Sequence, residues 1–145
     1  MLPPAFLRFL TVIDPRADRP VHRQLADLLR ARIAAGQLRP GDRLPAEHRL
    51  AQEYGIGRDS VRAALTILRG EGLLITRAPY GTRVRQQPDR RPVRVPRGSS
   101  VVVKMPTPEE RREHDLDEGV PMIVLTDPSG RMEVIAGDEV TLRFS

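Results

Sequence analysis

Apolar side chains recur with helical spacing in the middle of the chain. Between residues 58 and 69 they fall at Val61, Ala64, Leu65 and Leu68, the i, i+3, i+4, i+7 pattern of one helical face. The opposite face of this segment is polar and contains Arg58, Arg62, Thr66 and Arg69. The pattern predicts an amphipathic helix over 58–69, with one buried and one exposed side.

Two further helices are predicted before this one. Residues 21–35 place Val21, Leu25, Leu28, Leu29 and Ile33 on one stripe, and Gly36 suits the end of that helix. A short helix is expected over 45–54, followed by the connector Gly55-Ile56-Gly57, in which one glycine can adopt a left-handed conformation. Residues 44–73 are therefore expected to form a helix-turn-helix.

A β-hairpin is predicted after the third helix. Its strands are expected at 73–77 and 82–85, separated by Ala78-Pro79-Tyr80-Gly81. Three helices and a hairpin form the order of a winged helix-turn-helix, which assigns residues 1–87 to one domain. Within it, residues 6–10 are expected to form either a short strand or a helical turn over the core.

The composition changes after the hairpin. Residues 88–100 are rich in proline and arginine, which predicts an extended basic linker; the alternative is an edge strand at Val93-Arg94-Val95. Residues 101–145 predict a small α/β domain, with a buried-type strand at 101–105 and a helix from Pro106 to about Leu116, capped by Thr107. Three more strands are expected, at 122–126, 132–136 and 140–144. The predicted fold class is α+β.

Charge is distributed unevenly along the 145 residues, which include 24 basic and 19 acidic side chains and have a net charge of +5. Residues 1–87 contain 15 arginines and 8 acidic residues, whereas residues 88–145 contain 9 basic and 11 acidic residues. This distribution predicts that the first domain alone meets a polyanion. The few aromatic residues argue against a platform that stacks single-stranded bases.

Several classes of function are disfavoured by the sequence. The chain has no cysteine, which excludes disulfides, thiolate catalysis and cysteine-ligated metals. His22, His48 and His114 are scattered, and the acidic residues of 109–118 are typical of a solvated surface rather than a catalytic pair. No apolar run approaches the ~20 residues of a membrane span, and no signal-type cleavage site is present. We expect a cytoplasmic protein that is not an enzyme and has no cofactor, metal or membrane partner.

Arg58 and Arg62 are the first candidates for a binding site. They lie one turn apart near the N-terminus of the third helix, where a recognition helix in the DNA major groove presents side chains to base edges. Arginine can donate two hydrogen bonds to guanine O6 and N7. The alternative is that both are ordinary solvated charges.

The chain between residues 21 and 85 resembles the DNA-binding domain of the GntR family of bacterial transcription regulators. The resemblance rests on GQLRPGDRLPAEHRLAQEYGIGRDSVRAALTILRGEGLL and on the wing sequence YGTRV. It implies a homodimer that binds double-stranded DNA at a pseudo-palindromic operator, with operator contacts from Arg58 and Arg62. Ser60 matches the small polar residue between them, and Gly81 matches the glycine at the tip of the wing.

Three features depart from the family pattern. His48 stands where the family often has arginine, with Arg49 next to it, and Gly57 stands where a serine or threonine often caps the recognition helix. In the wing, Pro79 replaces a glycine and Arg83 replaces an aromatic residue, which predicts a stiffer and more basic hairpin.

The other candidate residues each have two interpretations. Asp59 is either a favourable charge at a helix N-terminus or an acceptor for a cytosine amino group. Ser60 either hydrogen-bonds to a backbone group or contacts a phosphate. Thr82 either closes the turn of the hairpin or contacts a phosphate. The remaining candidates either contact DNA or only add surface charge: His48, Arg49, Arg77, Arg83 and Arg85.

The segment PTPEERREHDLDEGVPMIVLTDPSGRMEV is similar to the start of the UTRA domain of HutC-type members, which is about three times longer than residues 101–145. We expect this domain to serve in dimerisation; the alternative is a pocket for a small-molecule effector. Two hypotheses remain for the function of the whole protein. The first is a sequence-specific DNA-binding regulator, favoured as a repressor, and the second is a non-specific or architectural DNA-binding protein of the plasmid-maintenance type.

Overall fold

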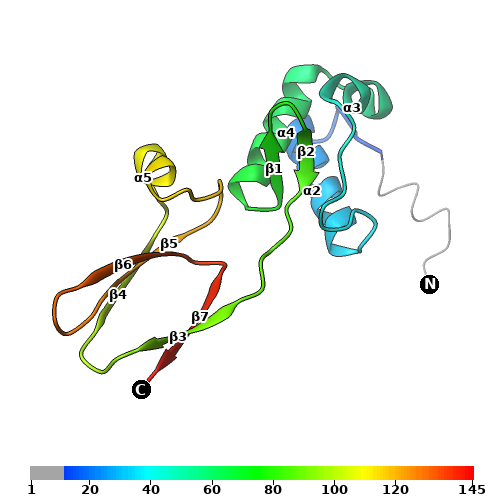
Figure 1. Cartoon of the computed structure of the whole chain (residues 1–145). Coiled ribbons are helices and arrows are strands. Elements are labelled where there is room, and N and C mark those ends of the chain that lie inside the picture. The colour runs from blue at the N-terminus through cyan, green and yellow to red at the C-terminus, as the bar shows by residue number, and fades with distance from the viewer. Residues whose placement is uncertain (1–11) are drawn as a thin grey trace. The chain divides into compact units, whose positions relative to one another are not determined.

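The computed structural model describes residues 12–145 (Figure 1), so the element expected at residues 6–10 lies outside the described residues. The chain divides into two compact units, the first ending at Arg85 and the second comprising Gln86–Ser145. No helix within residues 12–145 has the length and apolar character needed to cross a bilayer.

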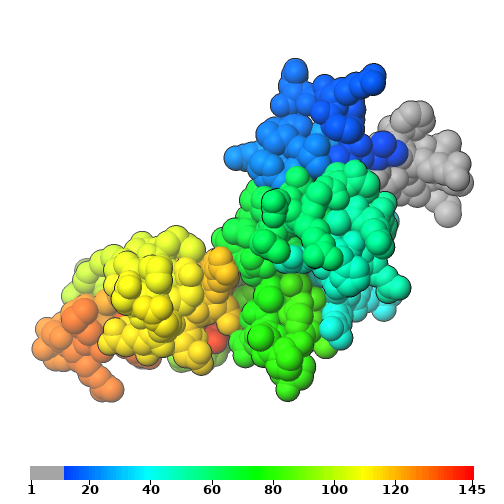
Figure 2. All heavy atoms as spheres, turned by 90° about the horizontal axis from the view of Figure 1, so that it is seen from above, coloured from blue at the N-terminus to red at the C-terminus, as the bar shows by residue number. Residues whose placement is uncertain are grey.

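The first unit is a winged helix-turn-helix, as predicted. Its helices are α2 (Val21–Ala34), α3 (Glu47–Tyr54) and α4 (Arg58–Gly70). Strands β1 (Leu74–Arg77) and β2 (Gly81–Val84) follow as an antiparallel hairpin, here called the wing. In the space-filling view the atoms of the wing, in bright green, lie at the surface beside those of the helices that precede it (Figure 2).

The core of this unit comes from the apolar stripes that the sequence predicts. Its largest fully buried side chains are Leu25, Leu29, Leu50, Val61, Leu65, Leu68 and Leu74. Burial of each leucine contributes about 1.5–3 kcal/mol of hydrophobic free energy. Leu74 and Val84, paired across the base of the wing, extend this core under the hairpin.

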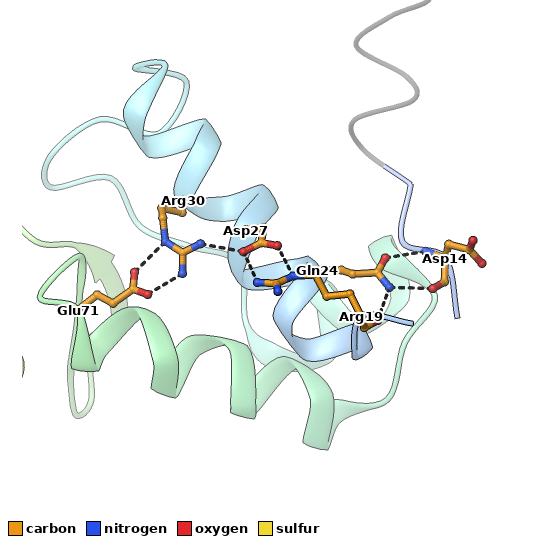
Figure 3. Close-up of polar contacts among 6 residues, drawn as sticks. All are labelled: Asp14, Arg19, Gln24, Asp27, Arg30 and Glu71. Atoms are coloured by element: carbon orange, nitrogen blue, oxygen red, sulfur yellow. Dashed lines mark hydrogen bonds and ion pairs between the residues drawn. The ribbon is translucent and has the colours of Figure 1, made fainter. Parts of the chain in front are cut away.

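A network of ion pairs ties α2 to the end of α4 (Figure 3). Arg30 donates from Nε and Nη2 to the carboxylate of Glu71, at 2.8 and 2.6 Å, and from Nη1 to Asp27 at 2.9 Å. Arg19 also donates two hydrogen bonds to Asp27. The guanidinium of Arg19, helped by that of Arg30, lowers the pKa of Asp27 below its ordinary value of 3.8.

The second unit is a small α/β unit. It contains β3 (Arg91–Val95), β4 (Ser100–Lys104), α5 (Pro108–Glu113), β5 (Met122–Thr126), β6 (Met132–Ala136) and β7 (Val140–Phe144). Strands β4, β5 and β6 form an antiparallel sheet in that order, and β3 pairs with β7 in parallel. Ile123, Ile135 and Val140 form its core cluster.

Two expectations about this unit require correction. The linker expected over 88–100 contains strand β3, because residues 91–95 pair with β7, which lies about 50 residues later in the chain. The alternative of a strand at 93–95 therefore holds. The strand expected to be buried at 101–105 is largely exposed, because β4 is an edge strand and Val102 and Val103 are 51% and 60% accessible.

Helix α5 is shorter than expected and ends at Glu113, while Leu116 is buried beyond its end. Its predicted cap is present: Thr107 Oγ1 accepts from Glu110 N, and Glu110 Oε2 accepts from Thr107 N. Glu110 also accepts from Lys104 Nζ at 2.6 Å, and this hydrogen bond lowers the pKa of Glu110.

Candidate nucleic-acid interface

The turn between α3 and α4 determines which side of α4 faces outward. Gly55 has the left-handed conformation (φ +65°, ψ +36°) that ends α3, and its N–H donates to Ala51 O. Gly57 occupies the N-cap of α4 and contributes no side-chain hydrogen bond there. With Val61, Ala64, Leu65 and Leu68 turned into the core, the polar face of α4 is left at the surface.

Arg58 and Arg62 both lie on this surface. Arg58 is exposed, and the side chain of Arg62 is 59% accessible. Arg62 is ion-paired within the protein: its Nη2 is 3.2 Å from Glu47 Oε2 of α3, and its Nη1 is 3.8 Å from Asp59 Oδ1. Two carboxylates therefore hold the second arginine, and one of them comes from the preceding helix.

The polar residues around these arginines are also accessible. The Asp59 side chain is fully exposed in the first turn of α4, where its charge is favourable, while Ser60 is half-buried. His48 and Arg49, in the first turn of α3, are both exposed. The helix-turn-helix thus places the candidates of α3 and α4 in one compact unit.

The wing forms the second part of the candidate interface. Arg77 and Arg83 are exposed, whereas Thr82 and Arg85 are half-buried. Thr82 is opposite Thr76 in the hairpin, with their hydroxyl oxygens 2.8 Å apart. Arg83 Nη1 donates to the carbonyl of Gly41 at 3.2 Å. Gly81 has a φ of +78°, a backbone conformation that glycine adopts without the steric cost that a Cβ would impose.

A third chain segment, which the sequence pattern does not predict, completes the wing. Leu44 N donates to Thr82 O, Gly41 N to Val84 O, and Val84 N to Asp42 O, so residues 41–44 pair with β2 along its outer edge. Arg43 is paired with Arg83 in this arrangement. A Cβ built on Gly81 would lie 3.6 Å from Nε and Nη2 of Arg43, so this exposed guanidinium lies close to the tip of the wing.

Arg43 is therefore a candidate DNA contact that sequence reasoning missed. The signal available was a basic residue directly after the Pro40-Gly41-Asp42 turn. That signal is weak, because the position of Arg43 depends on pairing with a strand about 40 residues further along.

Comparisons with known proteins find similarity in the part of the chain that forms this candidate interface. Residues 22–84 match the family described as "Bacterial regulatory proteins, gntR family". The chain is 40% identical over 79 residues to the probable rhizopine catabolism regulatory protein MocR of Rhizobium meliloti, a match that covers 54% of this chain and 16% of MocR. It is 42% identical over 69 residues to the mannosyl-D-glycerate transport/metabolism system repressor MngR of Escherichia coli, covering 48% of this chain and 29% of MngR.

A solved structure is similar as well. The chain of YtrA from Sulfolobus acidocaldarius, described as a GntR-family transcription factor, is 31% identical to this chain with a TM-score of 0.50. The match covers 53% of this chain and 81% of that chain. The matched region thus spans less than a third of MocR and of MngR but most of the YtrA chain.

Proposed function

Because the chain belongs to the GntR family of bacterial regulatory proteins, we propose that it binds double-stranded DNA sequence-specifically and regulates transcription. One observation carries the proposal. Helix α4 exposes Arg58 and Arg62 one turn apart near its N-terminus while its opposite face is buried in the core. A helix that enters a major groove needs this arrangement.

In the proposed complex, α4 lies in the major groove. Arg58 and Arg62 donate to guanine O6 and N7, and each bidentate pair provides about 1–3 kcal/mol of discrimination against a wrong base. Asp59 stabilises the first turn of α4 or accepts from a cytosine amino group. Ser60, His48 and Arg49 contact phosphates and fix the register of the helix.

The wing supplies contacts that do not depend on sequence. Arg77 and Arg83 neutralise phosphates beside the groove, and Thr82, the residue after Gly81 in β2, donates a hydrogen bond to a phosphate. Arg43 adds a third guanidinium near the same tip. These charges raise affinity for every duplex, so the discrimination depends on α4.

We also propose that the protein acts as a homodimer held by its second unit. One face of the β4–β5–β6 sheet has Val102, Val124 and Val134 in register across its middle, with the polar residues Ser100, Thr126 and Lys104 toward the strand ends. Val102 is 51% accessible, and Met132 on the same face is 66% accessible. A second copy packed there would remove this apolar surface from water.

Sedimentation velocity tests the dimer. Val102→Asp should convert the protein to a monomer at micromolar concentration, because a charge would be buried in the interface. Tyr80→Asp is the matched control, since Tyr80 is an exposed apolar side chain of the first unit and should leave the oligomeric state unchanged. A Val102→Asp variant that sediments like the wild type would overturn the proposal.

Repression is the proposed direction of regulation, by occupation of promoter DNA. The similarity to MngR, which is named as a repressor, supports this direction. A small-molecule effector bound by residues 101–145 stays a prediction.

Selection from a random-sequence DNA pool tests the proposed function. The full chain should enrich a pseudo-palindromic duplex and bind it about 10³-fold or more tightly than a scrambled duplex at the same salt concentration. A ratio below about tenfold would instead identify a non-specific or architectural DNA-binding protein.

A further inference from the structure

The guanidinium of Arg69 joins the last turns of α4 to the wing. Its Nη2 donates to Thr66 Oγ1 at 3.0 Å, and its Nη1 donates to Thr76 Oγ1 of β1 at 3.2 Å. Thr66 lies one turn before Arg69 on the same helix, whereas Thr76 belongs to the wing. One half-buried side chain on the polar face of α4 thus contacts both parts of the candidate interface.

These two contacts belong to a continuous chain of hydrogen bonds. At one end, the Thr66 hydroxyl donates to the backbone carbonyl of Arg62 at 2.9 Å, which leaves its oxygen free to accept from Arg69. At the other end, the hydroxyls of Thr76 and Thr82 are 2.8 Å apart across the hairpin. The path therefore begins at the backbone carbonyl of Arg62 in α4 and ends at the hydroxyl of Thr82 in the wing, which is proposed to contact a phosphate.

Other interactions hold the wing only in part. Leu74 and Val84 fix its base in the core, but Thr76 lies two residues nearer the tip, where β1 is exposed. Strand β2 is held by residues 41–44, through the hydrogen bond from Leu44 N to Thr82 O. On the other edge of the hairpin, Arg69 provides a polar connection between the outer half of β1 and α4.

We propose that Arg69 is a positioning residue that sets the wing relative to α4, so that the helix and the wing reach the DNA at the same time. It acts through Thr66 and Thr76 and does not itself contact DNA. This inference rests on the proposed function, in which both α4 and the wing bind one duplex. When Arg69 fixes the orientation of the wing before binding, little conformational entropy is lost on the DNA. A wing without this contact is ordered only when it binds, and the lost entropy weakens the affinity.

Dissociation constants over a series of KCl concentrations test the proposal. The probe is the fluorescein-labelled duplex that the full-length wild-type protein enriches from a random pool. The proteins are the wild type, Arg69→Met, Thr76→Val and the double variant. We expect each single variant to weaken binding about tenfold, the double variant to be no weaker than either, and the slope of log K against log salt to stay unchanged.

Arg69→Lys separates position from charge. Lysine keeps the positive charge but lacks the planar fork that reaches both threonines, so we expect it to bind as weakly as Arg69→Met. Recovery of wild-type affinity by Arg69→Lys would overturn the proposal. A salt slope lowered by about one in Arg69→Met would also overturn it, because that change indicates a lost phosphate contact. Losses of affinity that multiply in the double variant would overturn it as well.

The experiment also distinguishes a variant that does not fold and a wild-type protein that selects no DNA. If Arg69→Met does not fold, as judged by circular dichroism, Thr76→Val still breaks the connection while Arg69 keeps its charge, and wild-type affinity in that variant would overturn the proposal. Failure of the proposed function is distinguishable, because the wild-type protein would then enrich no duplex at all.

Discussion

The guanidinium of Arg62 lies 3.2 Å from the carboxylate of Glu47, so an arginine proposed to read DNA is ion-paired with the neighbouring helix. The pair links α3 to α4 on the exposed side of the helix-turn-helix, and Asp59 flanks it at 3.8 Å. Exposed ion pairs contribute little to stability, about 0–1 kcal/mol. The importance of Glu47 is therefore expected in DNA binding, where it restricts the positions open to Arg62.

Glu47→Gln should reduce the discrimination between DNA sequences. Without the carboxylate, the Arg62 side chain can reach phosphates as well as bases, and one negative charge is removed from the binding surface. We expect affinity for a scrambled duplex to rise about threefold and the ratio of specific to scrambled affinity to fall about tenfold. Fluorescence anisotropy with both duplexes measures the ratio.

Glu53→Gln is the control for this variant. It removes the same charge from the same helix, but Glu53 belongs to the last turn of α3 and lines a surface pocket with Arg32 and Tyr54, away from Arg62. Equal changes in the ratio for the two variants would show that only net charge matters, and that Glu47 does not orient Arg62.

Arg83→Ala should weaken binding to every duplex alike. Arg83 is exposed on β2, and its Nη1 donates a hydrogen bond of 3.2 Å to Gly41 O. Loss of one phosphate contact lowers the magnitude of the salt slope by about one and leaves base preference unchanged. Titrations over a range of KCl concentrations, with specific and scrambled duplexes, measure both quantities. A change in base preference at a single position would contradict this assignment.

Gly55→Ala should destabilise the first unit. The φ of +65° at Gly55 is unfavourable for alanine, and no atom lies within 4 Å of the position that its Cβ would occupy. The loss is therefore conformational and amounts to about 1 kcal/mol in the free energy of unfolding. Urea denaturation measures it.

Gly57→Ser, at the other end of the same turn, should instead stabilise the first unit slightly. Serine can cap α4, where Gly57 now contributes no side-chain hydrogen bond, and should stabilise by only a few tenths of a kcal/mol. If Gly55→Ala proved as harmless as this variant, the left-handed turn would not be needed to place α4.

The stability of the first unit should depend on Asp27 at acid pH. Since hydrogen bonds from Arg19 and Arg30 lower the pKa of Asp27 in the folded state, its ionised form stabilises that state above pH 3.8. This contribution is lost as the pH falls through the lower, folded pKa. Asp27→Asn should therefore lower the free energy of unfolding at pH 7, and its difference from the wild type should shrink as the pH falls below 3.8.

Urea denaturation at a series of pH values checks this dependence. Asp18→Asn, in the loop before α2, removes a carboxylate that is exposed and serves as the control. A difference between Asp27→Asn and the wild type that stays constant from pH 7 to pH 2 would refute the role given to the pair with Arg19.

The elements that the sequence predicts well are those set by local pattern. Helix α4 and its buried stripe follow from the spacing of Val61, Ala64, Leu65 and Leu68, and Gly55 marks the turn before it. The capping box of α5 is equally local, since Thr107 and Glu110 are three residues apart. In these cases the information lies within a few residues of the element.

The features that the sequence predicts poorly depend on distant pairing. Strand β3 contains Pro92 and is paired with β7 in parallel, so the sequence offers it only as an alternative to an extended linker. Arg43 is placed by a bridge to Arg83, and Arg69, whose position predicts only an exposed face, instead bonds to the wing. Contacts between distant elements decide all three, through backbone pairing for β3 and Arg43 and through side-chain hydrogen bonds for Arg69, and periodicity does not encode them.

Binding of the Arg58→Ala variant to the selected duplex and to its single-base variants tests the central claim most directly. If Arg58 reads a base from the start of α4, affinity for the selected duplex falls by about 1–3 kcal/mol and the preference for guanine is lost at one base step per half-site. Wild-type affinity together with unchanged base preference at every position would contradict the orientation proposed for α4 on DNA.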